Sequence, residues 1–415
     1  MVSNVLENGL TVIVNERPGA AFVSIGFSVG VGSHNEVPEQ LGIAHLTEHL
    51  VFKGTATRTV AEINRAIEEL GGELNAYTCE TRTVFTCTVL KRDMATAIDV
   101  LNDIVFYNTV PEDEFEKEKS VVLDELAMYA DRGECRVDEL ANRTALPDLP
   151  SYWSVGGKIE TVRMITRDDV LAFIDANYVP ANVRLVVTGD VTLDEVMALV
   201  ADDQPEFADM PVEVYHEPHT VTPVQADAVE PMNSGHSHVT FGWLWPEPFD
   251  ERTKAVATLA AVALGSGLGS RLARIREQYG YCYTISCYTE DYPDLSGVRG
   301  YAGTDIQNMD HLKQLVCEIF EEVAANGLEP WEHTRAVNTC TCELLRQSET
   351  VANANEMLIN DLDHERSVDV QAKTELYASI TLDEVNQFIA DKLVADTISF
   401  AEIHQQGDVD EEVEE

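Results

Sequence analysis

The sequence contains few positively charged residues. Lys and Arg together number 28 of 415 residues, against 73 Asp and Glu, and the formal net charge is −45. Most of the positive charge is Arg. A protein that binds nucleic acid through its phosphates needs a basic face, so this balance excludes nucleic acid as the main partner. Two interpretations of the charge stay open: a solvated acidic surface that keeps the protein soluble at high salt, or an acidic cavity that attracts basic peptides.

Paired cysteines and long apolar runs are also missing. None of the eight cysteines forms a C-x-x-C pair, which argues against a zinc ribbon or a redox site. Scattered cysteines in a chain of this size are typical of reduced thiols. The first residues lack the charged start and apolar run of a signal peptide, and no stretch is long enough to span a membrane. We therefore expect a cytoplasmic protein that does not enter a membrane.

The composition otherwise indicates a globular protein with two domains. The chain has 45% hydrophobic residues and is long enough for two domains of about 200 residues, each with its own core. We predict an α+β fold of two similar, duplicated domains, each a predominantly antiparallel sheet covered by helices, although no residue-level repeat is evident. The predicted parts are a first domain at 1–205, a linker at 206–222, a second domain at 223–407 and an acidic tail at 408–415.

Turn and capping residues locate the predicted elements. Asn8-Gly9 separates two short strands within residues 5–14, because Asn-Gly favours the tight turn of a hairpin. Thr59 can cap a helix that ends before Gly71-Gly72. Further strands are predicted at 22–31, 73–78, 83–90, 183–188 and 239–243, and further helices at 41–53, 92–106, 112–129, 193–201 and 251–264.

The most informative motif is H-x-x-E-H at residues 45–49, within the predicted helix 41–53. His45 and His49 are four residues apart, so a helix places their imidazoles on one face, where both can bind a single tetrahedral zinc ion. Glu48 is close enough to act on a water molecule at that metal. This order of residues is one of the signatures of zinc metallopeptidases.

A catalytic zinc generally has three protein ligands, so a carboxylate from a second element is expected. Glu125 lies in the predicted helix 112–129 within an apolar run, where an unpaired buried carboxylate would be costly and a zinc ion would remove that cost. Glu118 precedes it by two turns on the same face. We predict that Glu118 orients a histidine or Glu125 without binding the metal.

Residues 42–55, GIAHLTEHLVFKGT, resemble the active-site helix of the pitrilysin and mitochondrial-processing-peptidase family. The spacing of 76 residues between His49 and Glu125, and the glutamate seven residues before Glu125, also match that family. The resemblance extends over nearly the whole chain and includes the opening hairpin. It implies one zinc per chain bound by His45, His49 and Glu125, with Glu48 as the general base. The expected activity is that of a zinc-dependent endopeptidase, with the catalytic site in the first domain.

The resemblance also implies substrate-binding residues. Residues 71–78 resemble the family's edge strand beside the zinc, where Asn75 and Ala76 would pair with an extended peptide or unfolded segment. Arg276 and Tyr283 resemble an Arg and Tyr pair that would donate hydrogen bonds to a substrate carbonyl and its oxyanion. Without the family context, Asn75 could be a turn residue, and Arg276 and Tyr283 ordinary surface and core residues.

Length bears on assembly. Family members with four such domains enclose the substrate within one chain, so the resemblance implies that this two-domain chain forms a dimer, with itself or with a paralogue. By that analogy, Arg276 and Tyr283 would act at the partner's zinc. Two alternatives stay open: a non-catalytic scaffold or partner subunit, and an acidic binding protein with a vestigial site. The intact set of His45, Glu48, His49 and Glu125 argues against both.

Overall fold

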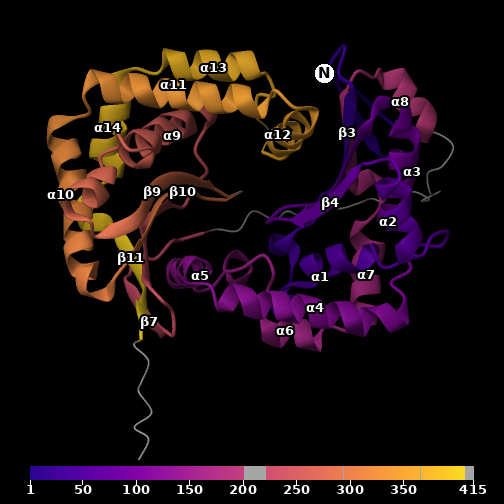
Figure 1. Cartoon of the computed structure of the whole chain (residues 1–415), viewed down its shortest axis with the longest axis horizontal. Coiled ribbons are helices and arrows are strands. Elements are labelled where there is room, and N and C mark those ends of the chain that lie inside the picture. The colour runs from indigo at the N-terminus through magenta and orange to yellow at the C-terminus, as the bar shows by residue number, and fades with distance from the viewer. Residues whose placement is uncertain (201–220, 293, 365, 407–415) are drawn as a thin grey trace, which may run out of the picture. The chain divides into compact units, whose positions relative to one another are not determined.

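The computed structural model describes residues 1–200, 221–292, 294–364 and 366–406, which form two compact units with one sheet each (Figure 1). Unit 1 comprises Met1–Ala127, Pro150–Glu217 and Arg346–Val368. Unit 2 comprises Met128–Leu149, Pro218–Leu345 and Asp369–Glu415. Among the described helices, none has the length and apolar character needed to cross a membrane. The predicted α+β class, with two helix-covered sheets, is confirmed.

The units differ from the predicted domains because each contains a helix from the other half of the chain. Residues 128–149, predicted in the first domain, belong to unit 2, where helix α5 (Gly133–Ala145) packs on the sheet. Residues 346–368, predicted in the second domain, belong to unit 1, where α12 (Val351–Asp363) packs across two strands. The predicted tail and all but the last two residues of the predicted linker lie outside the described residues.

Unit 1 contains a six-stranded sheet in the order β1-β2-β6-β3-β5-β4. Every neighbouring pair is antiparallel except β2 and β6, which are parallel. The strands are β1 (Val2–Val5), β2 (Thr11–Glu16), β3 (Phe22–Val29), β4 (Glu73–Thr78), β5 (Thr83–Leu90) and β6 (Val183–Gly189). Besides α12, the helices are α1 (Ile43–Val51), α2 (Val60–Glu68), α3 (Met94–Phe106), α4 (Glu112–Ala130), α6 (Ile159–Met164), α7 (Arg167–Asn177) and α8 (Leu193–Val200).

Unit 2 contains a five-stranded sheet in the order β7-β11-β8-β10-β9. Its strands are β7 (Ala228–Met232), β8 (Ser237–Trp245), β9 (Cys282–Asp291), β10 (Ser296–Thr304) and β11 (Ser399–Gln405). Besides α5, its helices are α9 (Glu251–Gly265), α10 (Met309–Asn326), α11 (Pro330–Gln347), α13 (Val370–Ser379) and α14 (Leu382–Lys392). In chain order, β7 to β11 repeat the pairing of β2 to β6, including the one parallel pair. The duplication that no residue-level repeat revealed is therefore visible in the strand order.

The packing of unit 1 explains why the sequence of β3 is largely apolar. All of its residues after Phe22 are buried, because the sheet is covered on both faces. Helix α3 packs against β3 and β5 on one face, and α12 crosses β3 and β6 on the other. The approach of α12 is so close that a Cβ atom on Gly26 would lie 2.6 Å from Ile359. A side chain at position 26 would therefore force the side chains of α12 that pack there to move.

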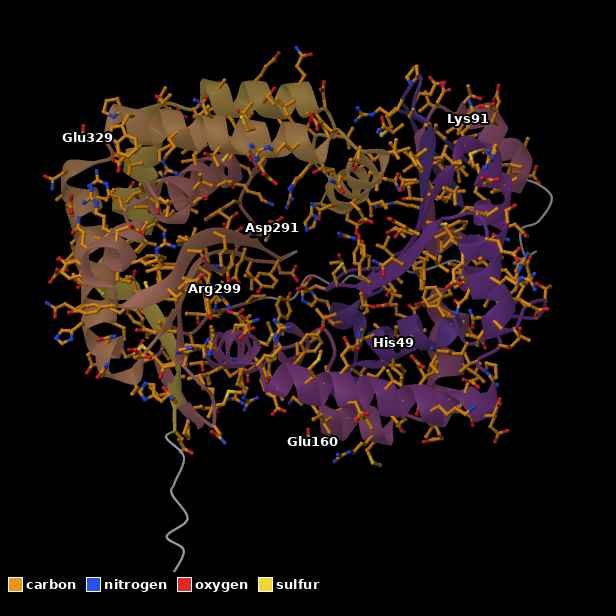
Figure 2. All side chains as sticks on the ribbon, in the orientation of Figure 1. His49, Lys91, Glu160, Asp291, Arg299 and Glu329 are labelled. Atoms are coloured by element: carbon orange, nitrogen blue, oxygen red, sulfur yellow. The ribbon has the colours of Figure 1, made fainter. Side chains whose placement is uncertain are left out.

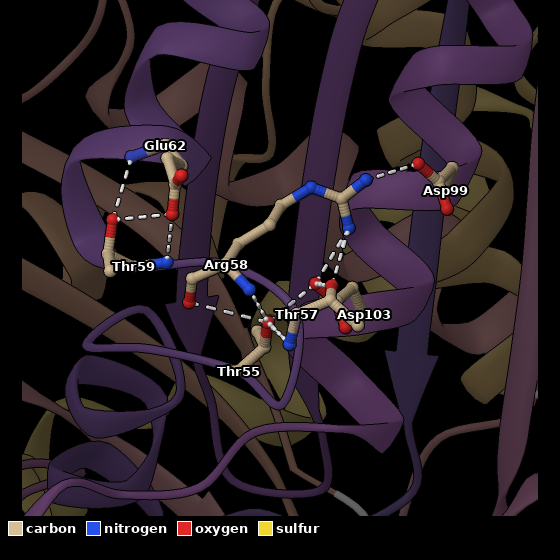
Figure 3. A network of polar contacts seen from close by, with 7 residues as sticks. All are labelled: Thr55, Thr57, Arg58, Thr59, Glu62, Asp99 and Asp103. Carbon is tan, nitrogen blue, oxygen red and sulfur yellow. Dashed lines mark hydrogen bonds and ion pairs between the residues drawn. The ribbon is translucent and has the colours of Figure 1, made fainter.

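Local sequence signals account for most element ends. Gly9, in the hairpin turn between β1 and β2, has a φ of 94°, which glycine adopts without a steric penalty. Thr59 caps α2 as predicted, and its hydroxyl accepts a hydrogen bond from the Glu62 backbone (Figure 3). The helix predicted at 41–53 is shorter in the structure, where α1 runs from Ile43 to Val51. It begins after Gly42 because that residue has a left-handed φ of 95°.

A polar network fixes the loop between α1 and α2 (Figure 3). The Asp103 carboxylate on α3 accepts hydrogen bonds from the hydroxyls of Thr55 and Thr57, at 2.6 and 2.7 Å, and from Arg58 at 2.7 Å. Arg58 also pairs with Asp99. Asp103 is buried, whereas the Asp99 side chain is 48% exposed. The buried Asp103 carboxylate therefore fixes the loop between α1 and α2 to α3.

This difference in burial predicts different costs for removing the two carboxylates. We expect Asp103→Ala to lower the free energy of unfolding by about 3 kcal/mol, because it leaves Arg58 and two hydroxyls without their buried acceptor. Asp99→Ala, the matched control, is expected to cost less than about 1 kcal/mol, since its ion pair is solvated. Urea unfolding of the chelator-treated proteins measures both values. Equal costs would contradict the proposed role of Asp103.

Candidate metal centre

Helix α1 is buried on every side except the one that carries two histidines. His45 and His49 are the only residues of this helix whose side chains are partly exposed (Figure 2 labels His49). The helix start is held by the buried Glu36, whose carboxyl oxygens accept hydrogen bonds from the backbone of Gly42 and Ala44, both at 2.8 Å. Burial raises the pKa of Glu36 to about 8, although both hydrogen bonds favour its ionised form. The two imidazoles therefore project from a rigidly placed helix.

Helix α4 brings a carboxylate to the two imidazoles. The Oε2 atom of Glu125 lies 3.4 Å from Nε2 of His49 and 3.9 Å from Nε2 of His45. One donor atom from each of the three residues falls within 4.8 Å of the others. Among the described residues, no other group of His, Cys, Asp or Glu side chains has this geometry. The three residues predicted as metal ligands are therefore brought together from two helices.

These donor atoms suit zinc. Bonds of about 2.0–2.2 Å in a tetrahedral site place neighbouring ligand atoms roughly 3.3 Å apart, close to the separations of the glutamate oxygen from the two imidazoles. Two nitrogens and one carboxylate oxygen are also a ligand set of catalytic zinc sites with an open fourth position. In the described structure, the ion-pair partners of Glu125 are these two histidines. A cation between the three groups would satisfy the carboxylate and both ring nitrogens.

Glu118 supports one of the histidines from behind. Its Oε1 atom lies 2.9 Å from Nδ1 of His49, and its Oε2 atom lies 2.8 Å from the ammonium nitrogen of Lys53. This contact leaves Nε2 of His49 directed toward Glu125, as a metal ligand requires. Burial alone would raise the pKa of Glu118, but the hydrogen bonds from His49 and Lys53 outweigh it and lower that pKa. Glu118 is thus kept as a carboxylate that orients His49.

The two imidazoles have different electrostatic surroundings. Burial, together with the neighbouring His49, lowers the pKa of His45 to about 4, and the charge of Glu125 opposes this only in part. Burial would also lower the pKa of His49, but Glu118, Glu48 and Glu125 reverse the direction and raise it. A neutral His45 has a free nitrogen lone pair, which metal binding requires. Glu118 can accept the proton on Nδ1 of His49 in a hydrogen bond and so leave its Nε2 available.

Glu48 lies beside the three donor atoms and is not one of them. Its Oε2 atom accepts a hydrogen bond from the Thr78 hydroxyl of β4 at 2.8 Å. Burial raises the pKa of Glu48, and the Thr78 hydrogen bond only partly offsets this effect. A carboxylate with a raised pKa is a stronger base and so accepts a proton more readily than an exposed one. The predicted base therefore has its own positioning contact on the neighbouring strand.

Asn75 and Ala76 lie on β4, at the end of the sheet. Among the described strands, β4 pairs only with β5, so the other edge of its backbone is available for an added strand. Asn75 is exposed, and its side-chain oxygen accepts a hydrogen bond from the Ala76 backbone. Asn75 and Ala76 precede Thr78 on the same strand, and Thr78 contacts Glu48. Their role in binding a peptide stays a prediction.

Arg276 and Tyr283 belong to unit 2, where the structure places them next to each other. Arg276 lies in a π-helical turn (Ile275–Tyr279), and its guanidinium pairs with Glu277 and lies 3.5 Å from the Tyr283 carbonyl oxygen. The Tyr283 side chain is 89% exposed. A large aromatic residue this exposed at the start of β9 is available for a ligand. Their action at a metal centre stays a prediction.

Three residues near the centre are not predicted from the sequence. Lys53 is four residues after His49, so helical spacing could have indicated that both reach Glu118. Thr78 is the last residue of the predicted strand 73–78, but nothing in the sequence indicates that it faces Glu48. Glu36 lies outside any predicted element, and only the fold shows that it holds the start of α1.

The contact between Glu118 and His49 can be tested through metal affinity. Glu118→Gln removes the charge that orients His49 and pairs with Lys53, so we expect zinc to bind about tenfold more weakly. Glu116→Gln, an exposed change on the same helix, is the matched control and should leave affinity unchanged. Competition with a chelating dye measures both dissociation constants. Wild-type affinity in Glu118→Gln would contradict the assigned role.

Comparison with known proteins agrees with this geometry. Residues 11–150 match the family described as Insulinase (Peptidase family M16), and residues 164–340 match the Peptidase M16 inactive domain. An uncharacterized zinc protease of Mycobacterium leprae is 32% identical over 78% of this chain and 73% of its own length. Another, of Streptomyces coelicolor, is 29% identical over 94% of this chain and 86% of its own length. A protease from Helicobacter pylori has the same fold, with a TM-score of 0.87 at 18% identity, covering 97% of this chain and 99% of its own. The chain therefore belongs to peptidase family M16 and has the half-length, two-domain form.

Proposed function

We propose that this protein is a zinc-dependent endopeptidase that cleaves extended peptides or unfolded segments. The observation that carries the proposal is the convergence of His45, His49 and Glu125 beside a buried Glu48 that is not needed as a ligand. Its membership in a family whose relatives are named zinc proteases supports the same chemistry. The alternatives of a non-catalytic subunit or a vestigial site would not need this set to be complete.

Each residue of the centre has a separate role in the proposed reaction. His45, His49 and Glu125 would hold one zinc ion, which supplies Lewis acidity toward water and the peptide carbonyl. Glu48 takes the proton of the attacking water on its carboxylate and delivers it to the leaving amine. Thr78 donates a hydrogen bond to Glu48 and so fixes which oxygen faces the reacting atoms. Glu118 and Lys53 hold His49 in its ligating orientation.

The free edge of β4 supports an extended substrate. A peptide that adds to this edge pairs through its own backbone, so its side chains would be only loosely selected. The strand leads from Asn75 and Ala76 to Thr78, which contacts Glu48. A bound peptide would thus be carried toward the proposed base. We propose peptides in extended conformation, not folded proteins, as the substrate class.

One zinc ion per chain is the expected stoichiometry. The described part of the chain has one group of metal-binding geometry, and it lies in unit 1. The residues 164–340, which match the family's inactive domain, contain none of the three proposed ligands. The topological counterpart of α1 in unit 2 is α9, which follows β8 as α1 follows β3. Its buried face consists of alanines and aliphatic residues.

The role of Glu48 can be separated from metal binding. We expect Glu48→Gln to keep stoichiometric zinc and to lose at least about a hundredfold in kcat on an unstructured model peptide, because an amide cannot take the proton. His49→Ala should lose zinc and activity together. Glu39→Gln, an exposed change before the same helix, is the control and should behave as wild type. Normal turnover by zinc-loaded Glu48→Gln would show that another group is the base.

We further propose a dimer in which Arg276 and Tyr283 of one chain act at the metal centre of the other. The proposal rests on the two-domain length and on the family resemblance of these residues. It predicts that Glu48→Gln chains and Arg276→Ala chains, each inactive alone, regain part of the activity when mixed, since one site of the mixed dimer is complete. Peptide cleavage by a dimer purified with two different tags measures this. A confirmed mixed dimer without activity would contradict the proposal.

A further inference from the structure

Strand β4 is held on both of its faces by side-chain hydrogen bonds. Side chains alternate along a strand, so Thr78 and Tyr77 point to opposite faces of the sheet. Thr78 reaches Glu48 of α1 on one face. On the other face the Tyr77 hydroxyl donates to the Glu356 carboxylate of α12, with an oxygen–oxygen distance of 2.7 Å. Tyr77 and Thr78 are adjacent on β4. The contact with α12 and the contact with the proposed base are therefore only one residue apart on the strand.

The face toward α12 is a tightly packed contact. Tyr77 packs against an apolar cluster formed by Ile13, Val84, Val186, Leu358 and Ile359. Burial raises the pKa of Glu356, and the hydrogen bond from Tyr77 acts in the opposite direction. A partly buried carboxyl group in an apolar cluster is costly without a partner. The charge of Arg82 also favours the ionised form of Glu356, so two groups of the β4–β5 hairpin stabilise the carboxylate on α12.

A second contact holds the end of the same strand. Arg82, in the turn between β4 and β5, donates to Asp363 at 2.6 Å and to Asn360 at 3.2 Å, both on α12. Arg82 is buried, and Asp363 also accepts from Arg184 of β6 at 3.0 Å. A free edge strand has backbone bonds on one side only and is easily displaced. Glu356 and Asp363 restrain this edge from α12, without occupying the side where a peptide would add.

We propose that Glu356 is a positioning residue for the peptidase reaction, because through Tyr77 it fixes both the β4 edge that receives the peptide and the Thr78 hydroxyl that orients Glu48. This inference rests on the proposed function. It assigns a role in catalysis to α12, which comes from the last fifth of the chain and touches none of the three proposed metal ligands through any hydrogen bond or ion pair of the described residues. Glu356 itself acts only through Tyr77.

The test is a double-mutant cycle measured on zinc-loaded enzyme. Tyr77→Phe removes one hydroxyl and is expected to lower kcat/KM on an extended peptide by about fivefold to tenfold, with a raised KM and a lowered kcat. Glu356→Leu should give the same loss, and the double variant should lose no more than either single one, since both remove one contact. Glu356→Gln keeps an acceptor for the hydroxyl and should retain near wild-type kinetics.

Two further variants separate positioning from general stability. Thr78→Val should lower kcat and leave KM unchanged, because it affects only the contact with Glu48. Tyr301→Phe is the matched control in unit 2, where the hydroxyl lies 2.9 Å from Nδ1 of His238. It should lower the unfolding temperature at most, with kcat and KM unchanged. Thermal unfolding and zinc content are measured for every variant.

Several results would overturn the inference. Unchanged kcat and KM in Tyr77→Phe would show that the contact is only structural, and additive losses in the double variant would show that Tyr77 and Glu356 act separately. Should Glu356→Leu fail to fold, the cycle of Tyr77→Phe with Glu356→Ala, which also removes the acceptor, decides instead. Failure of the proposed function looks different: wild type would not cleave the peptide, or Glu48→Gln would cleave it equally well.

Discussion

The structure of this M16-family protein depends on the burial of one short helix. Helix α1 is enclosed on all sides but one, and Glu36 fixes its first turn through two backbone hydrogen bonds. Its remaining face presents His45 and His49 to the carboxylate of Glu125 on α4. A cation between these three donor atoms would satisfy all of them at once, and the two packed helices set their spacing. Metal binding and the packing of α1 against its neighbours are therefore linked.

Around this centre, each polar group is oriented by another one further from the three donor atoms. Lys53 pairs with Glu118, Glu118 orients His49, and Thr78 orients Glu48. The same pattern extends through β4 to Tyr77 and Glu356 on α12. Such contacts matter because a catalytic group must be held within about half an ångström of its working position. The long helices and the sheet hold the backbone in place, and the short polar contacts fix the orientation of the individual side chains.

The two units have the same strand order, but among the described residues only unit 1 contains a group of side chains with metal-binding geometry. The strand order and directions of β7 to β11 repeat those of β2 to β6. The helix after β3 nevertheless differs from the helix after β8: α1 carries the histidines, whereas α9 buries alanines and aliphatic residues. Topology is determined by backbone pairing and by where apolar residues recur, so it survives when every polar residue of a site is replaced. This explains why the duplication is evident in the fold and not in the residues.

The sequence by itself determined the strands 73–78 and 83–90, the hairpin around Gly9 and the cap at Thr59, because these depend on neighbouring residues. It also identified the three side chains whose donor atoms the fold brings together, since helical spacing places His45 and His49 on one face and an apolar run around Glu125 calls for a counter-charge. Residues 130–182 received no predicted elements, although α5, α6 and α7 lie there. The exchange of α5 and α12 between units, and the contacts of Glu36, Thr78 and Glu356, were decided only by the tertiary structure. Those contacts join residues up to 279 positions apart, and no local pattern specifies which distant side chain a polar group will meet.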